Sequence, residues 1–158
     1  MKIEEIENDL TKIRPTKEIM KTTIQGINQN IPHSNGFIYC LIGAPGSGKS
    51  SLLLSLFRDK NYYKKKFEKL YLITPESSFL SVANHPFKKH KNVYHDINEQ
   101  LLNDIYEECL ESKHECIEDG IEIEHACLII DDFASELKNQ EIINGLKRVL
   151  TKSRHICL

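Results

Sequence analysis

The chain has 158 residues, 40% hydrophobic and 28% charged, which is typical of one soluble globular domain with a buried core. No apolar run is long enough to span a bilayer, and the N-terminal stretch MKIEEIENDLTKIRP is too polar for a signal peptide, so we expect a cytoplasmic protein without a membrane partner. The net charge of −2 hides an uneven distribution, because basic residues dominate positions 58–91 and 138–154 and acidic residues dominate positions 96–124.

The first part of the chain, residues 1–35, is expected to be a lead-in segment before one domain over residues 36–158. A weak helical repeat predicts a short helix that Pro15 interrupts. Its apolar positions are Ile3, Ile6, Leu10 and Ile13. The following run FIYCLI, residues 37–42, is short, apolar and bounded by glycines, which predicts a strand buried on both faces of a sheet.

Helices and strands are predicted to alternate over the rest of the chain. After the glycine-rich residues 43–50, spaced leucines predict a helix that ends near Asp59. Further strands are predicted over residues 69–74 (KLYLIT), 92–95 (NVYH) and 126–130 (ACLII), and amphipathic helices over residues 101–117 and 142–150. The last residues, HICL at 155–158, are predicted to begin one more strand. The alternation predicts an α/β fold with a mainly parallel sheet flanked by helices.

The stretch GAPGSGKS, residues 43–50, matches the pattern G-x-x-x-x-G-K-[ST] between a predicted strand and a predicted helix. Glycines let backbone N–H groups turn towards a phosphate chain, and the helix that follows adds the positive end of its dipole. Lys49 supplies a mobile positive charge, and the Ser50 hydroxyl completes a Mg²⁺ shell. An ordinary glycine-rich turn would leave this lysine and serine unexplained. The expected nucleotide contacts are Gly43, Ala44, Pro45, Gly46, Ser47, Gly48, Lys49, Ser50 and Ser51.

Two aspartates follow the apolar run of residues 126–130, where the carboxyl end of a parallel strand faces a ligand crevice. Asp131 is assigned to the metal, through water. Asp132 is assigned as the group that orients and deprotonates a water, on general-base reasoning. Many hydrolytic P-loop ATPases have glutamate at that place, and aspartate reaches one methylene less far. The alternative for Asp132 is a cap on the next helix.

These segments together resemble the DNA-packaging ATPases of large DNA viruses, which are poxvirus-type members of the FtsK/HerA superfamily. The similar stretches are FIYCLI with GAPGSGKS, then KLYLIT, NVYHDI, CLIIDDF and KSRHICL. The resemblance covers residues 37–158 and implies a P-loop NTPase of the ASCE/RecA-like kind. By position, Lys49 and Ser50 would bind phosphates and metal, Asp131 would hold Mg²⁺ and Asp132 would be the base. Arg154 is a candidate arginine finger acting across a subunit boundary, with a helix C-terminal cation as the alternative.

The same resemblance implies a ring-forming homo-oligomeric motor that uses ATP and Mg²⁺ to drive double-stranded DNA into a capsid. Its implied partners are the DNA and viral capsid or portal components, in the host cytoplasm, a viral factory or the virion. In this superfamily a further strand lies between the phosphate-loop strand and the strand of the acidic pair, and it ends in a polar sensor. Here the corresponding strand is predicted to begin at His155, so we expect a C-terminally incomplete sheet.

Two other functions stay open at this stage, a small P-loop phosphotransferase (a kinase) and a truncated nucleotide-binding fragment without turnover. A GTPase is disfavoured because no NKxD-type guanine-specificity motif is present, and an ABC cassette because no LSGGQ-like signature is present. The acidic residues after Asp96 also differ from the arginine-rich lid of nucleotide kinases.

Two lysine clusters, KKK at residues 64–66 and KKHK at residues 88–91, are candidates for contact with DNA phosphates. A solvated face is the alternative, since charge runs alone are weak evidence. The five cysteines include no CxxC pair and are expected to be free thiols, with Cys40, Cys127 and Cys157 in buried strands. The grouping of Cys109, His114 and Cys116 matches no known metal-ligand spacing.

Overall fold

The computed structural model describes residues 24–34, 36–156 and 158, without the side chains of residues 154 and 155. Three parallel strands form one sheet in the order β2–β1–β3. These strands are β1 (Lys69–Ile73), β2 (Val93–Tyr94) and β3 (Ala126–Ile130). The helices are α1 (Lys49–Arg58), α2 (Glu76–Ser81), α3 (Glu99–Glu118) and α4 (Gln140–Ile156), with a short 3-10 helix η1 (Glu136–Lys138).

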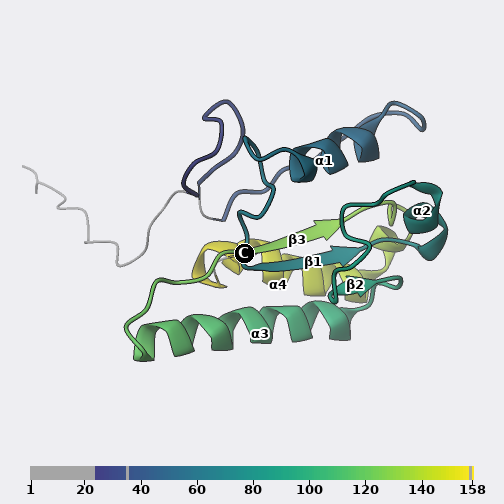
Figure 1. Ribbon diagram of the computed structural model, residues 1–158. Helices are drawn as coiled ribbons and strands as arrows, with labels where there is room; N and C mark the ends of the chain where they lie inside the picture. The colour runs from purple at the N-terminus through teal and green to yellow at the C-terminus, as the bar shows by residue number, and fades with distance from the viewer. Residues whose placement is uncertain (1–23, 35, 157) are drawn as a thin grey trace, which may run out of the picture.

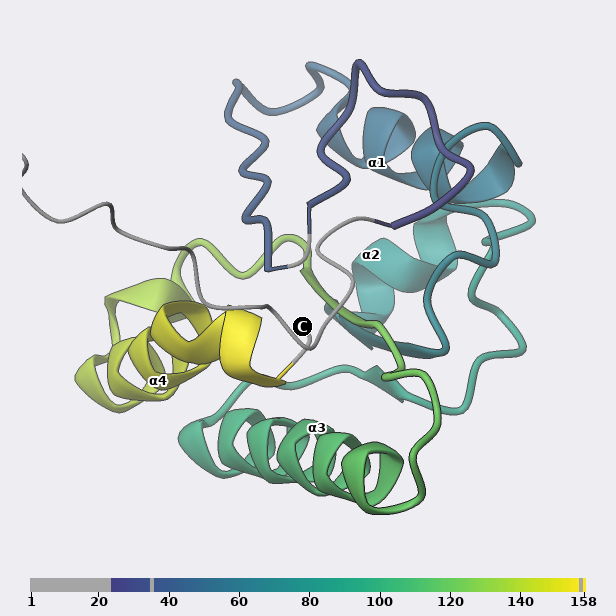
Figure 2. The same ribbon diagram turned by 90° about the vertical axis from the view of Figure 1, so that its left-hand side faces the viewer.

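The central strand β1 is buried on both faces, because its successive side chains point alternately to two layers of helices. Leu70 and Leu72 pack in one core with Phe57 of α1. Tyr71 and Ile73 pack in the other core, which α3 and α4 cover. Figures 1 and 2 show α1 on one side of the sheet and α3 with α4 on the other. The sheet is therefore the middle of three layers.

The parallel register brings the carboxyl ends of the strands to one edge of the sheet. Ile73, the last residue of β1, is level with Tyr94 of β2 and Ile130 of β3. The pairing continues one residue further, where the Asp131 N–H donates to the Ile73 carbonyl at 3.0 Å. The backbone at this edge is thus fixed by hydrogen bonds up to the first aspartate of the acidic pair.

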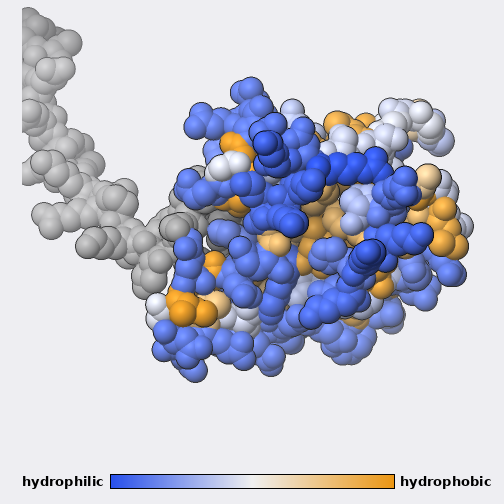
Figure 3. Space-filling model, viewed as in Figure 1, coloured by the Kyte–Doolittle hydropathy of each residue, from blue (hydrophilic) through white to orange (hydrophobic). Residues whose placement is uncertain are grey.

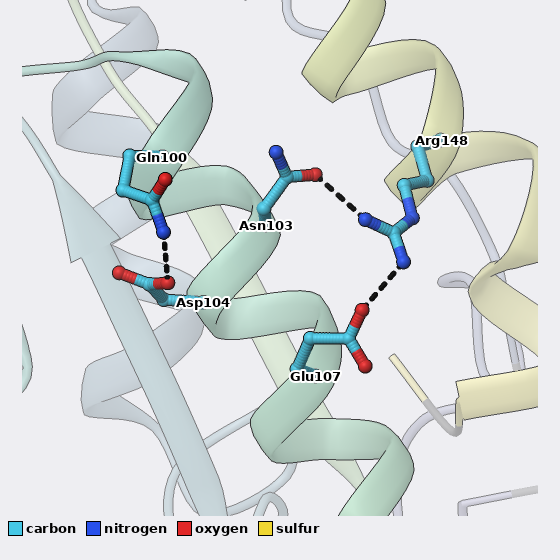
Figure 4. Close-up of polar contacts among 5 residues, drawn as sticks. All are labelled: Gln100, Asn103, Asp104, Glu107 and Arg148. Atoms are coloured by element: carbon cyan, nitrogen blue, oxygen red, sulfur yellow. Dashed lines mark hydrogen bonds and ion pairs between the residues drawn. The ribbon is translucent and has the colours of Figure 1, made fainter.

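The long helix α3 begins at a side-chain cap, because the Asn98 side-chain oxygen accepts from the Leu101 N–H at 2.8 Å. Its buried face packs against α4. At the edge of this contact Arg148 of α4 donates to the side chains of Asn103 and Glu107 (Figure 4). The Arg148 guanidinium also lies 4.2 Å from the centre of the Tyr106 ring. Arg148 was expected on the solvent-exposed polar face of this helix, but it lies at the interface with α3.

Three strands and three helices are where the sequence predicted them, within a few residues. These are β1, β2 and β3 with α1, α3 and α4. The prediction rested on apolar patterns, and most of these apolar positions are buried or half-buried, whereas Leu52, Ile117 and Leu150 are exposed. The short helix α2 was missed, and the helix predicted before Pro15 lies outside the described residues.

The predicted strand at residues 37–42 is wrong. These residues form no strand, and Ile42 is 90% exposed and Ile38 61% exposed. Phe37 alone is anchored, with its ring stacked on Tyr63 at 5.7 Å between centroids. An apolar run becomes a strand only where a neighbouring strand pairs with it, and no such neighbour lies beside this run within the described residues. Cys40, expected in a buried strand, is accordingly exposed.

The strand predicted to begin at His155 is also wrong, because α4 continues through Ile156. Ile156 lies seven residues after Val149, on the same face of the helix, and both side chains are buried, at 1% and 0% exposure. The apolar residue near the end of the chain is thus a helical core position. Among the described residues, no helix has the length and apolar character needed to cross a membrane.

The contact between α3 and α4 gives a test of the fold at Gly145. A side chain added there meets Leu102 Cδ1 at 3.0 Å and Leu102 Cβ at 3.2 Å. Because a large residue overpacks this interface, we expect Gly145→Leu to lower the free energy of unfolding by roughly 1–3 kcal/mol in urea denaturation. The control Lys147→Leu changes an exposed position of the same helix and should alter stability far less. Equal stability of the two variants would contradict the close packing.

Candidate functional site

The candidate site lies at the carboxyl edge of the sheet, where the N-terminus of α1 and the acidic pair after β3 come together. Residues 43–48 form the turn that enters α1, with Gly48 at the N-cap. The hydroxyl of Ser50, in the first turn of α1, reaches the carboxylate that follows β3. The site is thus assembled from segments about eighty residues apart in the sequence.

The N-terminus of α1 differs from those of the other three α-helices because it carries no acidic residue in its first turn. Helices α2, α3 and α4 each have a glutamate there, at Glu76, Glu99 and Glu141. No side chain caps α1, so its first N–H groups stay available for an external acceptor. A helix start with free N–H groups and no acidic residue of its own favours an anion.

Two glycines of the loop adopt left-handed backbone conformations. Gly46 has a φ of 74° and Gly48 a φ of 84°. A side chain would have open space at both positions, so the backbone conformation and not crowding requires glycine. At Gly43 the cause is different, because an added Cβ would lie 2.7 Å from the Ser47 hydroxyl. The sequence reasoning assigned all three glycines to the loop, and the structure supplies a separate reason for each.

Lys49 bends back over the loop. Its ammonium donates to the carbonyls of Gly43 and Ala44, at 2.9 and 3.0 Å. The loop closes on itself through the Ser47 N–H, which donates to the Ala44 carbonyl at 3.2 Å. Pro45 lies in the same exposed turn, and Ser51 is exposed in the first turn of α1. The lysine charge therefore lies over the loop, beside the helix N-terminus.

A hydrogen bond joins Ser50 to Asp131. The Ser50 Oγ donates to Asp131 Oδ1 at 3.2 Å. Two oxygen ligands from different elements thus lie close together, and hard oxygen ligands suit Mg²⁺. Within the described part of the chain, no group of three or more His, Cys, Asp and Glu side chains gathers as a metal site.

The second aspartate faces a different partner. Asp132 has a positive φ of 63°, and its Oδ2 accepts a hydrogen bond from the Ser78 Oγ of α2 at 2.6 Å. Adjacent carboxylates are thereby directed to two helices, Asp131 to α1 and Asp132 to α2. The residue at the N-cap of η1 is Ser135.

Ser78 is a residue that sequence reasoning missed, together with a group of rings that surrounds α2. The Phe79 ring lies 4.3 Å from the His85 ring and 5.5 Å from the His95 ring, between centroids. The His95 Nδ1 lies 3.0 Å from the carbonyl of Thr74, the residue that follows β1. Spacing alone gave no signal for this group, because its members come from α2 and from the segments on both sides of β2.

His85 belongs to this cluster, and its pKa is perturbed. Burial lowers the pKa of His85 below its usual value and the positive charge of Arg58 lowers it further, while Asp131 acts in the opposite direction. The Phe87 N–H lies 3.2 Å from His85 Nδ1, in the geometry of a bond that this nitrogen accepts. Both observations favour a neutral imidazole at pH 7 beside α2.

Arg154 lies on α4, close to its C-terminal end, and its side chain is outside the described residues. The arginine-finger role and the role of a helix C-terminal cation therefore both stay predictions. Cys157 also lies outside the described residues, and Cys127 lies half-buried in β3 as a free thiol.

Comparisons with known proteins agree with this geometry. The family model described as "AAA domain" matches residues 33–158, which is most of the chain and includes every described element of the site. No curated protein and no solved structure matches significantly. The phosphate-loop turn, the α1 N-terminus and the Ser50–Asp131 contact all lie within the matched region. The chain belongs to the AAA domain family and is an α/β P-loop nucleoside triphosphatase domain.

Proposed function

We propose that this domain binds ATP with Mg²⁺ and hydrolyses it, and that it is the motor domain of a translocase that packages double-stranded DNA. The observation that carries the first part is the hydrogen bond between Ser50 and Asp131. It places the first turn of the loop helix against the carboxylate after β3, and this pairing of a hydroxyl with a carboxylate suits the metal of a nucleotide.

The residues of the site have distinct proposed roles. The free N–H groups of the α1 N-terminus bind phosphate oxygens, and Lys49 turns from the loop carbonyls to the β- and γ-phosphates. Ser50 and Asp131 hold Mg²⁺, which supplies charge neutralisation at the phosphates when bound. Asp132 orients the attacking water and accepts its proton. Ser78 holds the Asp132 carboxylate in place through its hydroxyl.

Lys49→Ala tests the phosphate site. Removal of the Lys49 ammonium, which lies over the loop, should lower the rate of ATP hydrolysis by about 100-fold or more. The rate is measured as release of inorganic phosphate by the purified protein with Mg²⁺. Lys147→Ala, an exposed lysine of α4, is the control and should keep the full rate. A phosphorylated small molecule in place of inorganic phosphate would indicate a phosphotransferase and contradict the proposal. Binding of ATP without turnover would contradict it as well.

Ser78→Ala tests the proposed positioning of Asp132. The hydroxyl contacts the carboxylate and no residue of the phosphate loop, so its loss should lower kcat by roughly 10-fold and leave KM for ATP nearly unchanged. Ser78→Thr keeps the hydroxyl and should restore most of the rate. The matched control is Ser77→Ala, at an exposed serine of the same helix. A parallel rise in KM, or equal losses in both alanine variants, would rule out a positioning role.

The DNA part of the proposal is supported by the resemblance to packaging ATPases and by the uneven charge. Positions 58–91 contain nine Lys and Arg residues and only three acidic residues. We infer that the domain acts on double-stranded DNA as a homo-oligomeric ring, with capsid or portal components as further partners, in the cytoplasm or a viral factory. Binding of a duplex to such a ring couples hydrolysis to movement along the DNA.

Stimulation by DNA tests this part. We expect double-stranded DNA to raise the rate of ATP hydrolysis several-fold, measured as phosphate release at low salt, with sedimentation velocity reporting assembly under the same conditions. A mixture of free nucleotides at equal phosphate concentration is the control. Hydrolysis that is independent of DNA in a protein that stays monomeric would overturn the translocase while leaving the ATPase intact.

A further inference from the structure

Two lysine clusters that are separate in the sequence lie on connections that contact one another in the folded domain. The first is in the turn between α1 and β1, and the second is in the connection between α2 and β2. We call them together the basic surface. Its members are Lys60, Lys64, Lys65, Lys88, Lys89 and Lys91.

Aromatic packing beneath the lysines joins the two connections. The Phe57 ring at the end of α1 lies 5.4 Å from the Tyr63 ring and 5.3 Å from the Phe87 ring, between centroids. Tyr63 and Phe87 are buried, and each directly precedes a lysine cluster. A polar bond adds to this contact, because Arg58 donates to the Asn84 carbonyl at 3.1 Å. The two clusters therefore flank one aromatic core.

The turn that carries Lys64 and Lys65 is held in a defined conformation. The Tyr63 N–H donates to the Leu56 carbonyl at 2.9 Å, and the Lys66 N–H donates to the Tyr63 carbonyl at 3.2 Å. Lys65 has a positive φ of 56°, which places it at the bend of the turn. These bonds fix the backbone from which the ammonium groups extend.

The charges of the basic surface are not neutralised by neighbouring carboxylates. All six lysines are exposed, and none of them forms an ion pair with a described residue. The nearby acids are engaged with backbone groups, since Asp59 accepts from the Asn61 N–H at 2.8 Å and Glu68 accepts from the His125 N–H at 2.8 Å. The surface thus carries exposed positive charges on a backbone that hydrogen bonds and aromatic contacts hold in place.

The composition of this surface distinguishes among polyanionic partners. Among the described residues, the large exposed apolar side chains all lie outside residues 58–67 and 85–91, so these two segments supply no apolar anchor for insertion into a lipid bilayer. Figure 3 shows hydrophilic residues covering most of one face of the domain. Exposed lysines without apolar anchors in the same segments suit the backbone phosphates of a nucleic acid.

We propose that the basic surface binds the phosphate backbone of double-stranded DNA, independently of base sequence. The choice of DNA as the polyanion rests on the proposed function. The surface is at the C-terminal end of α1, and the phosphate loop is at its N-terminal end, about 15 Å away along a helix of 10 residues. Nucleotide and DNA therefore occupy opposite ends of one helix and do not compete for the same cations.

Charge reversal tests the proposal. Anisotropy of a fluorescein-labelled 30-base-pair duplex, measured without nucleotide at two salt concentrations, reports binding to the purified chain. Lys64→Glu with Lys89→Glu should weaken binding about 10-fold or more at low salt. The same change at two exposed lysines elsewhere, Lys138→Glu with Lys147→Glu, should weaken it less than about threefold. Circular dichroism shows that each variant is folded.

The outcomes separate this surface from the ATPase proposal. Lys49→Ala should bind the duplex as tightly as the unchanged chain, because Lys49 lies at the other end of α1. Equal weakening in the two reversal variants would overturn the proposal, as would binding that neither variant affects. A third outcome would also overturn the proposal. If the unchanged chain does not bind the duplex, and charge reversal at Lys64 and Lys89 dissociates larger assemblies, the surface mediates contacts between copies of the chain.

Discussion

The hydrogen bond between Ser50 and Asp131 is the contact on which the site depends. Residues 37–42, directly before the phosphate loop, form no strand, so within the described part of the chain the loop is positioned by the packing of α1 on β1 and by this polar bond at the sheet edge. The hydrophobic contact fixes the layer in which α1 lies, and the hydrogen bond fixes which end of the helix meets the strand ends. Without both, the helix N-terminus and the carboxylate would have no defined separation.

Much of the fold follows from apolar periodicity in the sequence. The strands at Lys69–Ile73 and Ala126–Ile130 and the helix at Glu99–Glu118 were predicted within a few residues, because each has a local pattern that its burial reproduces. The two errors share one physical cause. Residues 37–42 and the last residues of the chain have strand-like composition. A segment becomes a strand only when a neighbouring strand pairs with it, and the composition of the segment does not determine whether such a neighbour is present. In α4 the helical spacing of Val149 and Ile156 outweighs the local apolar run.

The site was predicted more completely at the loop than around it. A phosphate loop is local in sequence, so its glycines, lysine and serine are visible as one motif. The contacts of Asp132 with Ser78, and of Phe79 with two histidines, join segments that no spacing rule links. The adjacent aspartates illustrate the difference, because the sequence gives their identity while only the backbone angles direct one to α1 and the other to α2.

The exposed run at residues 37–42 has a consequence for the chain in solution. FIYCLI contains no charge and no proline, combines aromatic and β-branched residues, and presents Ile38, Tyr39 and Ile42 to water. A six-residue segment of this kind is a template for intermolecular cross-β pairing when its backbone is unpaired. The segment that leads into the phosphate loop therefore has the composition and exposure of an aggregation-prone strand, and a charged residue at position 42 is the substitution that would oppose such pairing.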